Sequence, residues 1–154
     1  MKRIMVLGIG NLLMSDDGFG VHVVRKLAEM GLPDAVELVD GGTHSYDLLD
    51  YFEQSDICFV VDAMHTGGKP GTVYRAPLNE LGLTPSADIQ SLHEISFAEA
   101  MHMVRLLGHN PEVIVYGIEP EYVDIGLELT SVVAEKVDWV AGKIHQEISE
   151  LLSS

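Results

Sequence analysis

Residues 3–20 read RIMVLGIGNLLMSDDGFG. The run at 3–8 is apolar and rich in branched side chains, which is typical of a strand covered on both faces. Glycines at positions 8 and 10 then allow the backbone to turn sharply where a side chain would clash. Asp16 and Asp17 follow, just before an apolar pattern of helical period. Because carboxylates are favoured at the start of a helix, one aspartate can serve as its N-cap, and the other is then free for chemistry.

Strand-like and helix-like periods alternate along the rest of the chain. They predict strands near 36–40, 57–61, 72–75 and 112–117, the third of them an antiparallel edge strand. Helices are expected near 19–28, 46–52 and 91–107, and from residue 130 onward. This order predicts an α/β fold, a three-layer αβα sandwich around a twisted, mostly parallel sheet of about five strands. We expect residues 1–154 to form a single domain.

Acidic side chains follow three of the predicted parallel strands. Asp16 and Asp17 come after the first strand, Asp40 ends the second and Asp62 ends the third. Ligands of open α/β sheets bind beyond the carboxyl ends of the strands, so these carboxylates are expected at one rim.

Three histidines are expected near the same rim. His44 and His65 lie in the loops after the second and third strands, and His93 lies in the first turn of a later helix. Two carboxylates and one imidazole can hold a metal such as zinc or nickel and leave positions open for another ligand. The pattern therefore indicates a metal site, but it does not choose among the three histidines.

Composition excludes several classes of protein. The formal net charge of −15 would repel a nucleic-acid backbone, so no nucleic-acid partner is expected. No apolar run is long enough to span a membrane. Cys58 is the only cysteine, which rules out a disulfide framework and fits a reducing cytoplasm. Its predicted strand environment indicates a small packed side chain and not a nucleophile.

A nucleotide site is the main alternative at this rim. Gly8-Ile9-Gly10 begins like a dinucleotide fingerprint, with Asp40 placed to reach a ribose, but Leu13 stands where the third glycine belongs. The alternative function is therefore a non-catalytic module that binds a nucleotide or another small ligand.

Six blocks of the sequence, taken in order, resemble those of nickel-iron hydrogenase maturation endopeptidases. The resemblance extends over nearly the whole chain, and the set is far more specific than any one block. The blocks are Gly8-Ile9-Gly10-Asn11, Ser15-Asp16-Asp17-Gly18-Phe19-Gly20, Asp40-Gly41-Gly42-Thr43, Val61-Asp62-Ala63, His93-Glu94 and Gly117-Ile118-Glu119-Pro120-Glu121.

The resemblance implies an αβα sandwich and a specific activity. Such enzymes remove a C-terminal extension from the hydrogenase large-subunit precursor after nickel insertion, and the nickel in the substrate is the recognition signal. The family's metal-binding residues fall on Asp17, Asp62 and His93. Zinc or another divalent ion is expected to substitute for nickel there. The resemblance also raises Asp16 as a supporting carboxylate or a general base, and a domain that binds the precursor as a chaperone without cutting it stays open. We expect a cytoplasmic monomer.

Overall fold

The computed structural model describes residues 2–42, 48–78 and 101–153, and the predicted capping box at Ser91 to Glu94 lies outside them. Residues 101–106 are helical as well. The strands are β1 (Ile4–Ile9), β2 (Val36–Gly42), β3 (Ile57–Ala63), β4 (Val73–Pro77) and β5 (Glu112–Ile118). The helices are η1, a 3-10 helix (Ser15–Gly18), α1 (Phe19–Met30), α2 (Leu48–Glu53) and α4 (Ser131–Ser153).

The five strands form one sheet in the order β2-β1-β3-β5-β4. β1 pairs in parallel with β2 and β3, β3 pairs in parallel with β5, and β4 runs antiparallel to β5 at the edge. The mostly parallel sheet and its antiparallel edge strand are as predicted. β1 and β3 are buried along their whole length, which explains why their sequences are continuous apolar runs and do not alternate.

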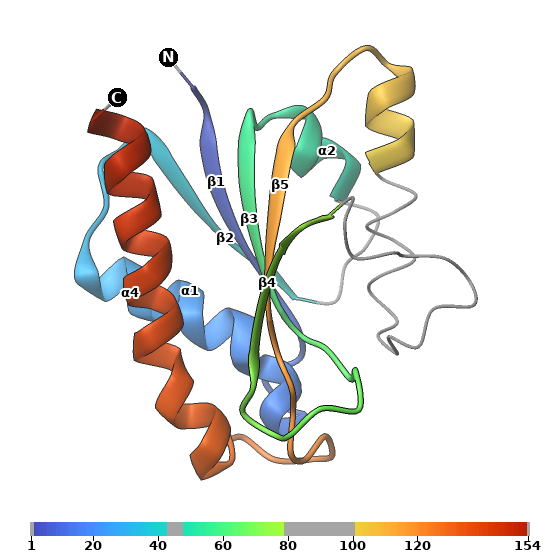
Figure 1. Ribbon diagram of the computed structural model, residues 1–154, viewed down its shortest axis with the longest axis vertical. Helices are drawn as coiled ribbons and strands as arrows, with labels where there is room; N and C mark the ends of the chain where they lie inside the picture. The colour runs from blue at the N-terminus through green and yellow to red at the C-terminus, as the bar shows by residue number, and fades with distance from the viewer. Residues whose placement is uncertain (1, 43–47, 79–100, 154) are drawn as a thin grey trace.

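The sheet has a hydrophobic core on each face. On one face Val6 and Phe59 pack with Leu27 of α1 and Ile144 of α4. On the other face Leu7 and Val60 pack with Phe52 of α2 and Val104 of the 101–106 helix. Figure 1 shows the same layers, with α1 and α4 on the left of the sheet and α2 on the right. The predicted three-layer αβα sandwich is confirmed.

The connections after β1, β3 and β5 gather at one end of the sheet, which Figure 1 shows at the bottom, opposite the two chain ends. This end is the carboxyl rim of the parallel strands. Gly20 sets how closely α1 approaches the strands there, because a Cβ atom at Gly20 would lie 2.1 Å from the carbonyl oxygen of Val61. Any larger residue would push η1 and α1 away from β3.

Candidate active site

Asp17 is a half-buried carboxylate on η1 at the carboxyl rim. Its Oδ2 accepts a hydrogen bond of 2.9 Å from the backbone N–H of Asn11. Gly10 makes this close approach possible: it has φ +136°, and a Cβ there would lie 1.8 Å from the carbonyl oxygen of Asp17. Among the described residues, no hydrogen bond uses Oδ1 of Asp17, so this oxygen is available to a ligand.

Asp62 is buried near the end of β3, with 1% of its surface exposed. The structure extends β3 beyond the predicted end, because Asp62 and Ala63 still pair with Gly117 and Ile118 of β5. Side chains alternate along a strand, and Cys58 and Val60 belong to the core beneath α2 and residues 101–106. Asp62 therefore lies on that face. η1 contacts β3, so Asp17 and Asp62 come from neighbouring segments.

The remaining rim residues of the sequence analysis divide into two groups. His65 and Asp40 are exposed, and Asp40 Oδ1 accepts a hydrogen bond of 3.1 Å from the N–H of Gly42. His44 and His93 lie outside the described residues. Within residues 2–42, 48–78 and 101–153, no group of three His, Cys, Asp or Glu side chains is placed to hold a metal ion. The third ligand of the predicted set, His93, thus stays a prediction.

Asp16 is fully buried, and its carboxylate is surrounded by donors from one distant loop. Oδ2 accepts hydrogen bonds from the N–H groups of Glu121 and Tyr122 at 2.8 and 3.0 Å, and from the Thr130 hydroxyl at 2.8 Å. Oδ1 accepts one from the Thr130 N–H, also at 2.8 Å. Asp16 therefore fastens η1 to the segment 121–130.

The expectation that one aspartate caps α1 is wrong. The N-cap residue of α1 is Gly18, with no side-chain capping bond, and both aspartates lie in the preceding η1. Asp16 makes long-range bonds to residues 121–130 and Asp17 bonds Asn11, so neither reaches the free N–H groups of α1.

Glu119 is a third buried carboxylate at the rim, after Asp16 and Asp62, and sequence reasoning quoted it without giving it a role. It accepts hydrogen bonds from the N–H and hydroxyl of Thr66, the N–H of Gly68 and the hydroxyl of Tyr74. Burial opposes ionisation of Glu119, but these donors outweigh it and hold the pKa of this carboxyl below its ordinary value. Glu119 thereby joins the loop after β3 to β4 and β5.

Cys58 is fully buried in β3 and takes no part in the candidate site. Burial raises the pKa of its thiol to about 12, so the thiol is not a nucleophile at neutral pH.

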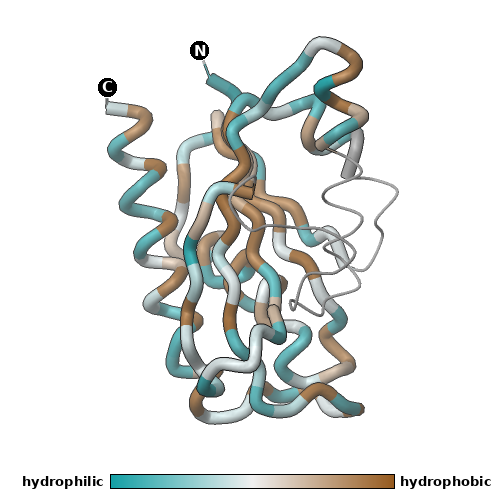
Figure 2. The backbone as a smooth tube through the Cα atoms, turned by 45° about the vertical axis from the view of Figure 1, so that its right-hand side comes forward, coloured by the Kyte–Doolittle hydropathy of each residue, from teal (hydrophilic) through white to brown (hydrophobic). Residues whose placement is uncertain are grey.

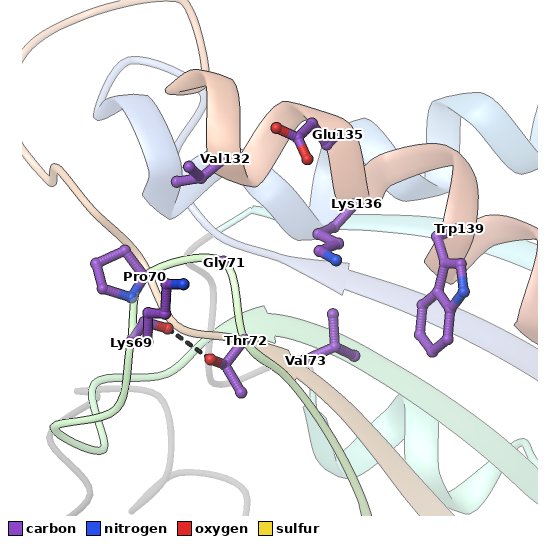
Figure 3. Close-up of a pocket in the computed structure, with 9 residues that line it drawn as sticks. All are labelled: Lys69, Pro70, Gly71, Thr72, Val73, Val132, Glu135, Lys136 and Trp139. Carbon is purple, nitrogen blue, oxygen red and sulfur yellow. Dashed lines mark hydrogen bonds between the residues drawn. The ribbon is translucent and has the colours of Figure 1, made fainter.

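A hollow of about 340 Å³ lies between α4 and the segment 69–73. Figure 3 shows Lys136 and Trp139 of α4 directed into this hollow, which Glu135 also lines. It contains neither Asp17 nor Asp62.

Comparison with known proteins places this geometry in a family. The family model described as hydrogenase maturation protease matches residues 21–147. The chain belongs to the hydrogenase maturation protease family. It is 37% identical over 154 residues to the putative hydrogenase maturation protease MJ0253 of Methanocaldococcus jannaschii, covering 97% of this chain and 98% of that protein. It is 35% identical to the hydrogenase expression/formation protein HupD of Rhodobacter capsulatus, covering 96% of this chain and 71% of that protein.

Solved structures agree with this membership of the hydrogenase maturation proteases. The hydrogenase maturating endopeptidase HybD from Escherichia coli superposes with a TM-score of 0.84 at 28% identity, covering 96% of this chain and 93% of that one. The NiFe hydrogenase maturation protease HybD from Thermococcus kodakarensis gives a TM-score of 0.77 at 28% identity, covering 99% of both chains. These relatives are named as proteases or endopeptidases of hydrogenase maturation. The predicted function is confirmed at this level, and the nucleotide-binding module is not favoured.

Proposed function

We propose that this endopeptidase recognises the nickel ion of the large-subunit precursor through Asp17, Asp62 and His93. The observation that carries the proposal is the placement of two carboxylates from different segments, η1 and β3, at one rim. Carboxylate oxygens and an imidazole nitrogen are a donor set that nickel accepts, and zinc or another divalent ion would fit it as well.

The choice of His93 as the third ligand rests on the family resemblance of the His93-Glu94 block. His93 itself lies outside the described residues. Asp62 belongs to the face of the sheet that α2 and residues 101–106 cover. His65, in the loop after β3, and Asp40, near the end of β2, are both exposed, so neither is a buried side chain that could bind the metal.

The chemistry follows from this arrangement. Nickel bound to the substrate would hold the scissile segment at the rim, polarise its carbonyl and lower the pKa of an attacking water. Oδ1 of Asp17 is available for such a contact, while the Asn11 N–H fixes Oδ2. We assign Asp16 a positioning role and not that of a general base, because its oxygens already accept four hydrogen bonds from residues 121–130.

The cellular setting is part of the proposal. A single buried cysteine fits a reducing cytoplasm, where the large-subunit precursor would be the protein partner. No helix within the described residues is long and apolar enough to cross a membrane. We infer that the enzyme works as a monomer on a precursor that already holds nickel.

Cleavage of nickel-loaded precursor, followed by mass spectrometry, tests the ligand set. Asp17→Asn, Asp62→Asn and His93→Ala should each abolish the loss of the C-terminal extension, with circular dichroism unchanged. Asp40→Asn is the matched control, because Asp40 also follows a parallel strand but lies exposed at the end of β2, and it should cleave normally. Normal cleavage by the His93→Ala variant would remove His93 from the set.

A further inference from the structure

Large apolar side chains are exposed beside Asp16 and Asp17 at the carboxyl rim. Ile125 is 83% exposed, Leu127 70%, Leu13 60% and Tyr122 50%, and Val123 is exposed as well. We call this set the apolar rim patch: Leu13, Tyr122, Val123, Ile125 and Leu127. Figure 2 shows hydrophobic segments on the loops at this lower end as well as along the central strands. Large apolar patches on a protein surface mark contact sites for other molecules.

The apolar rim patch is continuous because its two loops pair through their backbones. The N–H of Gly126 donates to the carbonyl of Leu13, and the N–H of Ser15 donates to the carbonyl of Gly126, both at 2.9 Å. Met14 and Gly126 form a parallel bridge. Leu13 therefore lies beside Ile125 and Leu127, which flank Gly126.

The patch is held in place by the same contacts that hold η1. The Asp16 carboxylate binds residues 121–130, and the Ser15 hydroxyl donates a hydrogen bond of 3.0 Å to the carbonyl of Asp124. Ser15 also adopts φ +50°, a left-handed conformation that non-glycine residues rarely adopt. A surface fixed in this way loses little conformational entropy when a partner binds.

Acidic residues border the patch and indicate the charge of its partner. Glu121, Asp124 and Glu128 are all exposed and alternate with the apolar residues of the same loop. A second copy of this chain would place the same acidic border opposite its own, in a protein of net charge −15, and the two would repel. The border is complementary to a partner whose apolar surface is flanked by lysine or arginine.

We propose that the apolar rim patch docks an apolar, basic-bordered surface of the hydrogenase large-subunit precursor, a proposal that rests on the function proposed above. Docking at the patch brings that surface to the loop that Asp16 fastens beside Asp17. Binding and cutting are thereby coupled through one rigid segment.

Steady-state cleavage of nickel-loaded precursor by the Leu13→Ser/Ile125→Ser/Leu127→Ser variant tests the docking role. The three side chains are exposed, so thermal stability should be unchanged, while KM for the precursor should rise about tenfold or more with kcat retained. Leu106→Ser is the matched control: Leu106 is 74% exposed on the 101–106 helix, away from the rim, and KM should not change.

Direct binding and size-exclusion measurements separate this proposal from the proposed function. If the wild type binds precursor without shortening it, the proposed function fails, and weaker binding by the triple variant still supports the docking surface. If the wild type cleaves and the triple variant has an unchanged KM, the docking proposal fails and the function stands. A wild-type dimer that the triple variant converts to a monomer would show that the patch is a self-interface and would overturn the proposal.

Discussion

Asp16 and Asp17 are neighbours on the same short 3-10 helix, yet the fold uses them in opposite ways. Asp16 is fully buried and accepts four hydrogen bonds from residues 121–130. Asp17 is half-buried and accepts one, from Asn11. Consecutive side chains of a 3-10 helix point about 120° apart, so one faces the protein and the next faces the rim. The difference shows that Asp16 fastens η1 to residues 121–130, and it supports the proposal that Asp17 binds a ligand.

The largest effect that this comparison predicts is on activity at Asp17. Asp17→Asn keeps the size of the side chain but removes its charge. Loss of a residue that only supports a metal ligand typically costs about 10–100-fold, so loss of a proposed ligand should lower cleavage of nickel-loaded precursor by about 100-fold or more. Thermal unfolding should show little change, because only the Asn11 hydrogen bond is affected. Full activity in Asp17→Asn, measured by precursor mass, would contradict the proposal that Asp17, unlike Asp16, binds the ligand.

The second-largest predicted effect is a loss of folding stability when Asp16 is replaced. Asp16→Ala leaves four donors of residues 121–130 without an acceptor, so the free energy of unfolding should fall by about 3 kcal/mol. Urea denaturation measures it, with Asp17→Ala as the matched control at about 1 kcal/mol or less. Equal losses in the two variants would contradict the buried, saturated role of Asp16.

Glu119 is a second buried carboxylate that, like Asp16, fastens segments of the rim together. Because its pKa is shifted, its contribution to stability should depend on pH. Its pKa is below the ordinary value in the folded state, so its stabilising contribution is complete above its ordinary pKa near 4.5 and is lost as pH falls through the lower, folded value. Glu119→Gln should therefore have a lower free energy of unfolding than wild type at neutral pH, and this difference should become smaller in acid. A difference that stays constant between pH 7 and pH 3, measured by urea denaturation, would show that the charge of Glu119 does not contribute to stability.

The smallest predicted effect is a loss of stability from an exposed ion pair at the end of the sheet opposite the carboxyl rim. Arg3 and Asp56 form an ion pair at 3.3 Å, with side chains 57% and 35% exposed. Arg3→Ala should cost about 0.5 kcal/mol, because exposed ion pairs are screened by water, and cleavage should be unchanged. A large loss of activity in this variant, seen in the same mass assay, would mean that the site depends on more than the carboxyl rim.

Much of the fold was predictable because its signals are local. Continuous apolar runs mark β1 and β3, and glycines with positive φ, Gly31 and Gly108, follow the ends of two helices. The role of Asp16 was not predictable, because its partners are more than a hundred positions away in the chain. Glu119 had no local signal either, since its donors come from the loop after β3 and from β4. The carboxylates of Asp17 and Asp62 were placed at one rim because strand ends follow from topology alone.

The most direct test of this account is the mass of the large-subunit precursor after incubation with the enzyme, with and without nickel in the precursor. Wild type should shorten the nickel-loaded precursor at its C-terminus and leave the nickel-free precursor intact, and Asp17→Asn should shorten neither. Cleavage of both forms by wild type, or of the loaded form by Asp17→Asn, would contradict recognition of the substrate's nickel by Asp17.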